Sequence, residues 1–401
     1  MSRRPVRVEY GLLALASVGY FSLMFCWFSL AAFLPVVTRE LGLSSTQGGF
    51  LVGAVPLVYI PIALFSGAVI DNVGSRRALG VGIVVLGAAQ ALRAGAVDFW
   101  SLLLPTLLFG VGGTGVTFGL PKLVSELFPP ERSGTMSSVY MASSYFGTAT
   151  VFAVGRPVVG PLLGGWRSVF LYSGVVAAAI GVVWFVVAGW LADVETGGGE
   201  TAGVTDVAAD IRAVLGQRAI FLLVAIGTTY LLLSHGMQGL LQTVLEARGL
   251  SPTTAGRVTS GLVVCQIAGA LVVPTVSDRT GRRRDAVVGC GLLALAGLLG
   301  LLAGGSVALT ALVVGVVGFG LGGLSPLIRV IPVEMEGIGP GLTGTAVGLV
   351  FAVGEAGGFL GPFLIGLLED LTGSYVPGIG VLALGAVVVV LSGLALGEPG
   401  A

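Results

Sequence analysis

The segment LGLSSTQGG at residues 41–49 is matched by a second segment, RGLSPTTAG, at residues 248–256. A shift of 207 residues aligns the two, and the same shift superposes further matching residues along the chain. These pairs are Gly42 and Gly249, Ser44 and Ser251, Thr46 and Thr253, Gly49 and Gly256, Ala63 and Ala270, Asp71 and Asp278, Gly74 and Gly281, and Arg76–Arg77 and Arg283–Arg284. One offset held over so long a segment indicates that the chain contains two copies of a single unit.

Apolar residues dominate the 401-residue chain: 55% are hydrophobic, only 10% are charged, and the mean hydropathy is +1.01. Soluble domains average about 25% charged residues, and a soluble fold of this composition would have too few polar side chains to cover its surface. The composition therefore excludes a soluble enzyme, a soluble nucleic-acid binder and a secreted disulfide scaffold. A net charge of zero, from 20 basic and 20 acidic residues, also argues against a nucleic-acid partner.

Twelve apolar runs are long enough to cross a bilayer as helices. They lie at residues 11–37, 47–70, 77–96, 99–121, 134–160, 166–191, 218–243, 255–276, 286–304, 307–333, 343–368 and 375–396. A polar interval separates six of these runs from the other six. We therefore expect an all-α membrane protein with an N-terminal six-helix bundle (1–191), a cytoplasmic central loop (192–217) and a C-terminal six-helix bundle (218–401).

Basic residues are distributed unevenly between the two sides of such a chain. One side, or the helix ends that face it, holds only Arg39, Arg93, Arg156, Arg167, Arg248 and Arg257. Cytoplasmic loops carry an excess of Lys and Arg, so we expect both termini in the cytoplasm and the chain in the cell membrane. We interpret Arg93, near the end of the third run, as an anchor at the membrane interface.

The two copies have the same orientation, because an even number of spans separates them. Parallel repeats related by an axis along the membrane normal form a transporter architecture, with the substrate site near the midplane between the halves. The sequence has no GxxxxGK[ST] loop for ATP phosphates, so we expect an ion gradient or exchange to drive transport. Cys26, Cys265 and Cys290 lie far apart in apolar runs without CxxC spacing, so we expect no metal or other cofactor.

The loop between the second and third runs reads Gly67-x-x-x-Asp71-Asn72-x-Gly74-Ser75-Arg76-Arg77, and its copy reads Asp278-Arg279-x-Gly281-Arg282-Arg283-Arg284. Both resemble the loop G-x-x-x-D-R-x-G-R-R of the major facilitator superfamily. Asn72 replaces the first Arg of that pattern, Ser75 displaces the basic pair, and Pro274 replaces the leading Gly in the second copy. The resemblance covers the whole chain and implies a 12-helix secondary transporter built from two parallel repeats.

The resemblance also implies a gate of charged residues at the cytoplasmic helix ends. There Asp71 and Asp278 would pair with arginines and hold that side shut. The alternatives are a basic loop that follows the positive-inside rule and, at the ends of the fourth and tenth runs, charged side chains that extend to the interface. The predicted gate residues are Asp71, Arg76, Arg77, Lys122, Glu126, Asp278, Arg279, Arg282, Arg283, Arg329 and Glu334.

Two glycine-rich runs resemble different branches of this superfamily. The fifth run reads Gly147-x8-Arg156-x3-Gly160-Pro161-x2-Gly164-Gly165, as in its proton antiporters, except that Arg156 replaces a glycine. The eleventh run reads Gly354-Glu355-Ala356-Gly357-Gly358-Phe359, similar to nitrate and nitrite porters. Those porters hold the anion with arginines in the second and eighth spans. Here the second span has none and the eighth has Arg257 at its outer entrance, which argues against nitrate.

Ionisable residues deep within a span are costly and are candidates for function. Glu355 lies in the middle part of its run, where a carboxylate among apolar groups can take up and release a proton near neutrality. We interpret it as a candidate for proton coupling, or alternatively as a structural partner for an arginine or the backbone. Arg156 could bind an anionic group with its planar guanidinium, or could extend outward to the interface.

The seventh run carries polar groups on adjacent turns of one helix. Gln238 and Gln242 lie four residues apart and share a face, and His235 is one turn from Gln238. The resemblance implies that this helix lines the substrate cavity, so Tyr230 and these three residues are candidates to face a polar substrate. For His235, the alternatives are a proton relay and a satisfied helix-contact residue.

These features predict a secondary active transporter that moves a small solute, with a preference for a small organic anion, by alternating access and with proton coupling. We expect it to act as a monomer whose partners are its substrate, protons and the lipid bilayer. A proton-coupled exporter of drugs or metabolites is the alternative. A nitrate or nitrite porter, a channel and a membrane-embedded enzyme are remote, since a channel needs no paired gate loops and the chain lacks a metal or nucleophile cluster.

Overall fold

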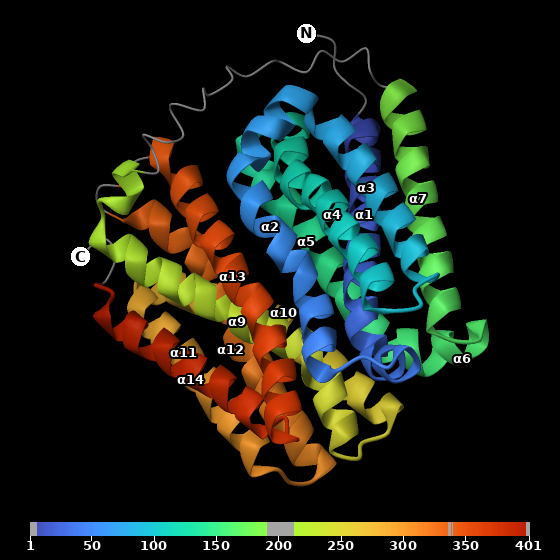
Figure 1. Ribbon diagram of the computed structural model, residues 1–401. Helices are drawn as coiled ribbons and strands as arrows, with labels where there is room; N and C mark the ends of the chain where they lie inside the picture. The colour runs from blue at the N-terminus through green and yellow to red at the C-terminus, as the bar shows by residue number, and fades with distance from the viewer. Residues whose placement is uncertain (1–5, 191–211, 336–337, 339, 398–401) are drawn as a thin grey trace. The chain divides into compact units, whose positions relative to one another are not determined.

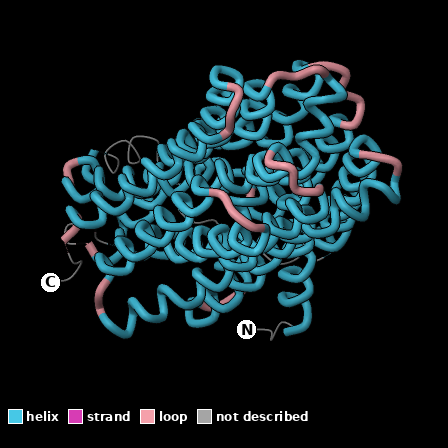
Figure 2. The backbone as a smooth tube through the Cα atoms, turned by 90° about the horizontal axis from the view of Figure 1, so that it is seen from below, coloured by secondary structure: helices cyan, strands magenta, loops and turns pink. Residues whose placement is uncertain are grey.

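The described chain is entirely helical. The structure is a computed structural model that describes residues 6–190, 212–335, 338 and 340–397. Within these ranges every element of regular structure is a helix and no strand is present, as Figure 2 shows. The predicted all-α fold is confirmed.

Each of the twelve predicted spans corresponds to a helix in the structure (Figure 1). The fifth span is composite, because a π-helix, η1, joins two α-helical parts. The elements are α1 (Val6–Leu41), α2 (Ser45–Val73), α3 (Ser75–Arg93), α4 (Phe99–Leu127), α5 (Pro130–Thr150), η1 (Val151–Val159), α6 (Gly160–Leu163), α7 (Trp166–Trp190), α9 (Arg218–Ala247), α10 (Pro252–Thr280), α11 (Arg283–Ala303), α12 (Val307–Glu334), α13 (Pro340–Thr372) and α14 (Val376–Ala395).

Eleven helices of the described chain are long and apolar enough to cross a membrane. The remaining predicted span, α3, has 19 residues and carries three arginines, which lower its hydropathy. Its ends are polar, but its middle, from Ala78 to Ala89, contains no charged residue. In length α3 therefore fits the predicted third span. The arginines at its two ends lower its hydropathy relative to that of the eleven helices above.

The repeat in the sequence is also a repeat in the structure. Helices α2 and α10 each contain 29 residues, and both their first and their last residues differ by the same 207 positions. Helices α4 and α12 also end 207 residues apart. The packing repeats as well, since α3 lies against α4 and α7, while α11 lies against α12 and α14. The two copies therefore fold alike.

Glycines that match between the copies make the turns between helices. Gly42 and Gly249 have φ angles of 64° and 90°, and Gly74 and Gly281 have φ angles of 87° and 67°. This left-handed region is open to glycine and costly for other residues, so a glycine at each position allows one helix to stop and the next to begin. Two of the three matched glycine pairs are thus turn residues, and the third, Gly49 and Gly256, lies inside helices.

The chain divides into two compact units. The first contains Met1–Val36 and Pro61–Thr201, and the second contains Val37–Ile60 and Ala202–Ala401. The first half of α2 therefore packs with the C-terminal unit. The predicted boundaries, 1–191 and 218–401, instead place all of this helix in the N-terminal bundle. Most of the predicted loop 192–217 lies outside the described residues.

Within the first unit, α3 and α7 approach each other backbone to backbone. A Cβ atom added to Gly87 would lie 2.3 Å from the backbone nitrogen of Ala178, and one added to Gly174 would lie 2.4 Å from that of Ala91. Lipid tails are as apolar as the side chains, so helices in a membrane gain most from such close packing of small residues.

We predict that Gly87→Ala lowers the thermal stability of the purified protein, because the added methyl group forces α3 and α7 apart. Overpacking of this kind costs roughly 1–3 kcal/mol. The control is Gly289→Ala in α11, where an added Cβ meets nothing within 4 Å. Alanine favours a helix over glycine, so the control variant should be as stable as the wild type or more stable. Equal melting temperatures for the two variants would contradict this packing argument.

Candidate transport site

Helices α9 and α13 pack more closely than ordinary side chains allow, and this contact builds the centre of the second unit. A Cβ atom added to Gly357 would lie 2.0 Å from the carbonyl oxygen of Thr228, and one added to Gly361 would lie 2.3 Å from that of Leu232. The glycine-rich run of α13 therefore serves to seat this helix on α9. The two ionisable residues discussed next belong to these two helices.

The contact brings Glu355 of α13 next to His235 of α9. Their Oε2 and Nε2 atoms are 4.0 Å apart, and the two side chains are only 13% and 15% exposed. The Oε2 atom of Glu355 is buried and has no hydrogen-bond partner among the described residues. At this separation the carboxylate and the imidazole interact electrostatically, and a proton passes between them only when they approach to hydrogen-bonding distance or through one water.

A glycine provides the space in which this pair meets α2. A Cβ atom added to Gly358 would lie 3.0 Å from the Oε2 atom of Glu355, 3.0 Å from the Cδ2 atom of His235, and 3.1 Å from the Cβ atom of Pro56. Pro56 belongs to the first half of α2. The pair therefore lies where three helices of the second unit converge.

The other predicted residues of α9 have more structural surroundings. The Nε2 atom of Gln238 donates to Gln266 Oε1 on α10, at 3.0 Å, and to Ser234 Oγ, at 3.2 Å. Gln242 is 1% exposed and donates to Glu246 Oε1 at 3.1 Å. Tyr230 is half-buried on the same helix. Of the four predicted residues of α9, His235 lies beside the carboxylate of Glu355, and Gln238 links α9 to α10.

Arg156 lies in the π-helix η1 of the first unit and is 9% exposed. Its guanidinium donates to the carbonyl oxygen of Ala32 in α1, at 3.4 Å. It thus points toward the neighbouring helix and does not extend outward. Isolated π-helical turns within α-helices occur often at functional sites, because the extra residue redirects the side chains around it.

Arg93 is fully buried, so its interpretation as an interface anchor is wrong. Its guanidinium donates to Thr106 Oγ1 at 3.1 Å and to Gln90 Oε1 at 2.9 Å, and it lies 4.3 Å from the centre of the Phe109 ring. The reason is that α3 packs against both α4 and α7, which enclose its last turn. Gln90, three residues before Arg93 on the same face, was the sequence signal that this face is polar and internal.

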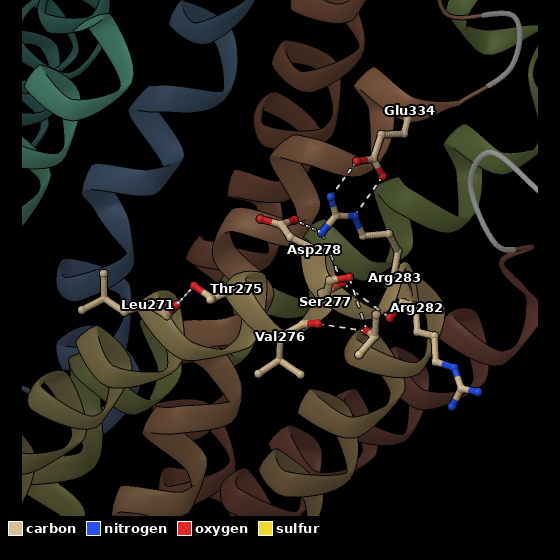
Figure 3. A network of polar contacts seen from close by, with 9 residues as sticks. Leu271, Thr275, Val276, Ser277, Asp278, Arg282, Arg283 and Glu334 are labelled. Atoms are coloured by element: carbon tan, nitrogen blue, oxygen red, sulfur yellow. Dashed lines mark hydrogen bonds and ion pairs between the residues drawn. The ribbon is translucent and has the colours of Figure 1, made fainter. Parts of the chain in front are cut away.

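A network of charged residues joins three helix ends in the second unit, as Figure 3 shows. Arg283, at the start of α11, donates to both carboxylate oxygens of Glu334, at 2.6 and 2.9 Å. The same guanidinium contacts Asp278 at the end of α10 and Ser277 Oγ at 3.2 Å. One arginine therefore fixes the ends of α10 and α12 against the start of α11.

The first unit uses a different chemistry at the equivalent helix ends. Ser75 Oγ, at the start of α3, donates to Glu126 Oε2 near the end of α4. The carbonyl oxygen of the half-buried Arg76 accepts a bond from Trp184 Nε1 on α7, at 2.8 Å. The Asp71 side chain lies outside the described part of the chain.

The remaining predicted gate residues are placed as follows. Arg77 and Arg279 are exposed, Lys122 is half-buried, and Arg282 lies 3.7 Å from Asp285 with both side chains largely exposed.

Arg329, which the sequence groups with Glu334 at the end of the tenth run, contacts other residues in the structure. Glu334 is engaged by Arg283, whereas Arg329 donates to the carbonyl and hydroxyl oxygens of Ser325, both at 2.7 Å. The Arg329 guanidinium also lies 4.5 Å from the centre of the Phe351 ring of α13. Residues five apart on a helix do not share a face, which explains why the two groups separate.

The sequence profile described as Major Facilitator Superfamily matches residues 16–362 and 228–399, which together cover most of the chain. The chain belongs to the Major Facilitator Superfamily. The predicted resemblance is confirmed, and the chain is a membrane transporter for a small-molecule substrate and not an enzyme.

Two relatives have names that refer to organic acids. The 3-(3-hydroxy-phenyl)propionate transporter of Escherichia coli (strain K12) is 28% identical over 371 residues, which cover 90% of this chain and 86% of the relative. A protein of Agrobacterium vitis with the provisional name tartrate transporter is 28% identical over 382 residues, which cover 88% and 83%. These names describe the relatives.

A solved structure of this superfamily has the same fold. A bacterial homolog to the human lysosomal transporter Spinster, in an inward-facing and unoccupied conformation, gives a TM-score of 0.73. It is 15% identical, and the match covers 98% of this chain and 95% of that one. At this identity the likeness concerns the fold.

We predict that Arg283 and Glu334 are energetically coupled, because both oxygens of the carboxylate are engaged and the Arg283 side chain is 11% exposed. A double-mutant cycle with Arg283→Gln and Glu334→Gln should give a coupling free energy of about 1 kcal/mol or more in denaturant unfolding. The exposed pair Arg282 and Asp285 is the control and should give at most about 0.5 kcal/mol. Equal coupling in both cycles would contradict the assigned role of Arg283.

Proposed function

We propose that this transporter moves a small organic anion across the cytoplasmic membrane by alternating access, with protons as the coupling ion. The observation that carries the proposal is the pair of Glu355 and His235, 4.0 Å apart between two spans. Ionisable groups at such a position are costly, and in transporters they often form part of a proton pathway. The names of the relatives support an organic acid as the substrate.

The proposed coupling follows from the chemistry of the pair. When a proton is bound to Glu355, its carboxyl group is neutral. A conformational change that keeps this group in apolar surroundings then costs less free energy. When the proton leaves, Glu355 is charged and its surroundings provide few hydrogen bonds. The protonated and deprotonated pairs would therefore favour different conformations, which links proton release to the transport cycle.

Arg156 is the proposed contact for the anionic group. Its guanidinium is permanently charged, planar and suited to bind a carboxylate through two parallel bonds. Burial strengthens such an interaction, because water competes less for the charge. The proposed role rests on this chemistry and on the position of Arg156 in a π-helical turn beside α1.

Several further properties belong to the proposal. The arginines of the α2–α3 and α10–α11 turns support a cytoplasmic location for that end of the helices, with both termini on the same side. We propose that the protein works as a monomer, since each sequence copy supplies half of the spans that a transporter of this architecture needs.

Proton-coupled export of a drug or metabolite is the second candidate. It is favoured by the glycines of the antiporter-like run in the fifth span, which pack on α1. A Cβ atom added to Gly147 would lie 2.4 Å from the carbonyl oxygen of Phe21, and one added to Gly160 would lie 3.0 Å from the Phe33 ring. The direction of substrate movement under an imposed pH gradient distinguishes the two candidates.

Glu355→Gln should abolish proton-driven accumulation of substrate, because glutamine keeps the size and polarity of the side chain but carries no exchangeable acid proton. The measurement is uptake of labelled tartrate and 3-(3-hydroxyphenyl)propionate into proteoliposomes under an imposed pH gradient. Exchange of internal for external substrate should survive, since exchange needs no net proton movement.

The matched control for this test is Glu369→Gln, near the end of the same helix α13. It should accumulate substrate as the wild type does, because Glu369 lies about four helical turns beyond Glu355 on α13. Accumulation by the Glu355→Gln variant with an unchanged pH profile would assign Glu355 a structural role. Failure of the wild type to take up either probe would contradict the organic-anion proposal itself.

Replacement of Arg156 should weaken anion binding in a graded way. Loss of a hydrogen-bonded charge pair costs roughly 1.5–3 kcal/mol, so Arg156→Gln should raise the half-saturation concentration about tenfold or more. Arg156→Lys keeps the charge without the planar fork and should be intermediate. Arg257→Gln, an exposed arginine at the start of α10, is the control and should leave this constant unchanged. The same result for the Arg156→Gln and Arg257→Gln variants would remove Arg156 from the binding site.

A further inference from the structure

The first turn of α2 takes part of its hydrogen bonding from another helix. The opening backbone N–H groups of an α-helix have no partner within that helix. In α2, Ser44 serves two of them, through its hydroxyl to Gln47 N at 3.2 Å and through its carbonyl to Gly48 N at 3.0 Å. The N–H groups of Ser45 and Thr46 instead donate to the two carboxylate oxygens of Asp370, at 3.0 and 2.7 Å.

Asp370 lies more than 320 residues away, in the last turn of α13. Both bonds involve a charged acceptor at the positive end of a helix, which is a favourable arrangement. The hydroxyl of Tyr375, which precedes α14, lies 3.4 Å from Ser45 Oγ and adds a second contact at the same point. Two helices are thus joined through the beginning of one and the end of the other.

The second copy of the repeat has one N–H fewer to satisfy at this point. Its equivalent helix, α10, begins with Pro252 at the position that matches Ser45. Proline has no N–H to satisfy and is well suited to the first position of a helix. Ser251 caps α10 through its hydroxyl to Thr254 N at 3.2 Å, as the matching Ser44 does for Gln47 N in α2. Where α10 has Pro252, α2 has Ser45, whose N–H needs an acceptor. The distant carboxylate of Asp370 is that acceptor.

On the N-terminal side of Asp370, α13 meets α2 in a row of close backbone contacts, here called the α2–α13 seam. A Cβ atom added to Gly366 would lie 2.1 Å from the carbonyl oxygen of Ser45, and one added to Gly49 would lie 2.3 Å from that of Pro362. Further along, the Phe50 ring packs edge-on against Phe359, with centroids 5.3 Å apart. The seam then reaches Pro56, which lies beside Gly358 and the carboxylate of Glu355.

We propose that Asp370 is a positioning residue for transport: its carboxylate holds the first half of α2 on α13 in this conformation and releases it when this end of the second unit opens. Release would withdraw Pro56 from the wall beside Glu355 and His235. Asp370 is exposed, so its bonds are moderate in strength and reversible. The inference rests on alternating access, which requires that α2 leave α13 in another conformation.

Distance measurements between spin labels on the full-length protein in lipid nanodiscs test this inference. One label replaces Arg39, exposed at the end of α1, and the other replaces Leu371, which is 71% exposed and adjacent to Asp370. The three native cysteines are replaced by alanine. Both labelled positions belong to the second unit, so the measured distance reports whether the start of α2 stays on α13.

The variants form a graded series. Asp370→Ala removes both acceptors and should raise the ratio of the long-distance to the short-distance population by roughly five- to thirtyfold, the effect of losing a helix cap. Asp370→Asn keeps one acceptor and should lie between this variant and the wild type. Ser45→Pro removes one donor while it keeps a good first residue for the helix, so it should also be intermediate.

The matched control is Asp98→Ala. Asp98 caps α4 through the N–H of Ser101 at 2.8 Å, and this backbone bond lowers the pKa of its carboxyl below the ordinary value. It is a helix cap of the same chemistry, but it joins no second helix, so its loss should leave the distance distribution unchanged.

The inference is overturned if Asp370→Ala and Ser45→Pro give the wild-type distribution, or if Asp98→Ala shifts it equally. Ser45→Pro keeps the test valid if Asp370→Ala does not fold. Asp370→Glu retains the carboxylate and should restore most of the short-distance population. The readout needs no substrate, so its failure is distinguishable from failure of the proposed function, which is tested by the movement of organic anions and protons.

Discussion

Close contact between helix backbones is the constraint on which the rest of this structure depends. A helix in lipid satisfies its own backbone hydrogen bonds, and apolar side chains gain little by leaving lipid for another helix. Association must therefore come from close packing, and glycine permits the closest. In α13, Gly357 and Gly361 bring the helix onto α9, while Gly366 meets the start of α2. One helix thus fixes two neighbours.

These close helix contacts determine where the polar groups lie. Glu355 and His235 lie 4.0 Å apart because the close contact at Gly357 and Gly361 brings α13 and α9 together. Arg93 is enclosed because small residues bring α3 against its neighbours. Asp370 reaches the first turn of α2 because Gly366 lets the two helices touch one turn earlier. Packing decides where each charge lies, and position decides what the charge can do.

The sequence predicts local structure well and distant pairing poorly. The shared offset correctly predicted that α2 and α10 correspond, since turn glycines and helix caps act within a few residues. Glu355 stood out because a carboxylate is conspicuous in an apolar run. Its proximity to His235, and the use of Asp370 by α2, follow from contacts between segments more than 100 residues apart, which composition and periodicity do not encode. Arg93 was misplaced because helix position does not reveal which face neighbours enclose.

The most direct test of the central claim, that one carboxylate–imidazole pair couples protons to an organic anion, uses wild-type proteoliposomes without any imposed pH or voltage gradient. An external pH electrode records the response when tartrate or 3-(3-hydroxyphenyl)propionate is added outside. The account predicts that the external solution becomes more alkaline as protons enter with the anion. Entry of labelled anion with no accompanying change in external pH would contradict it.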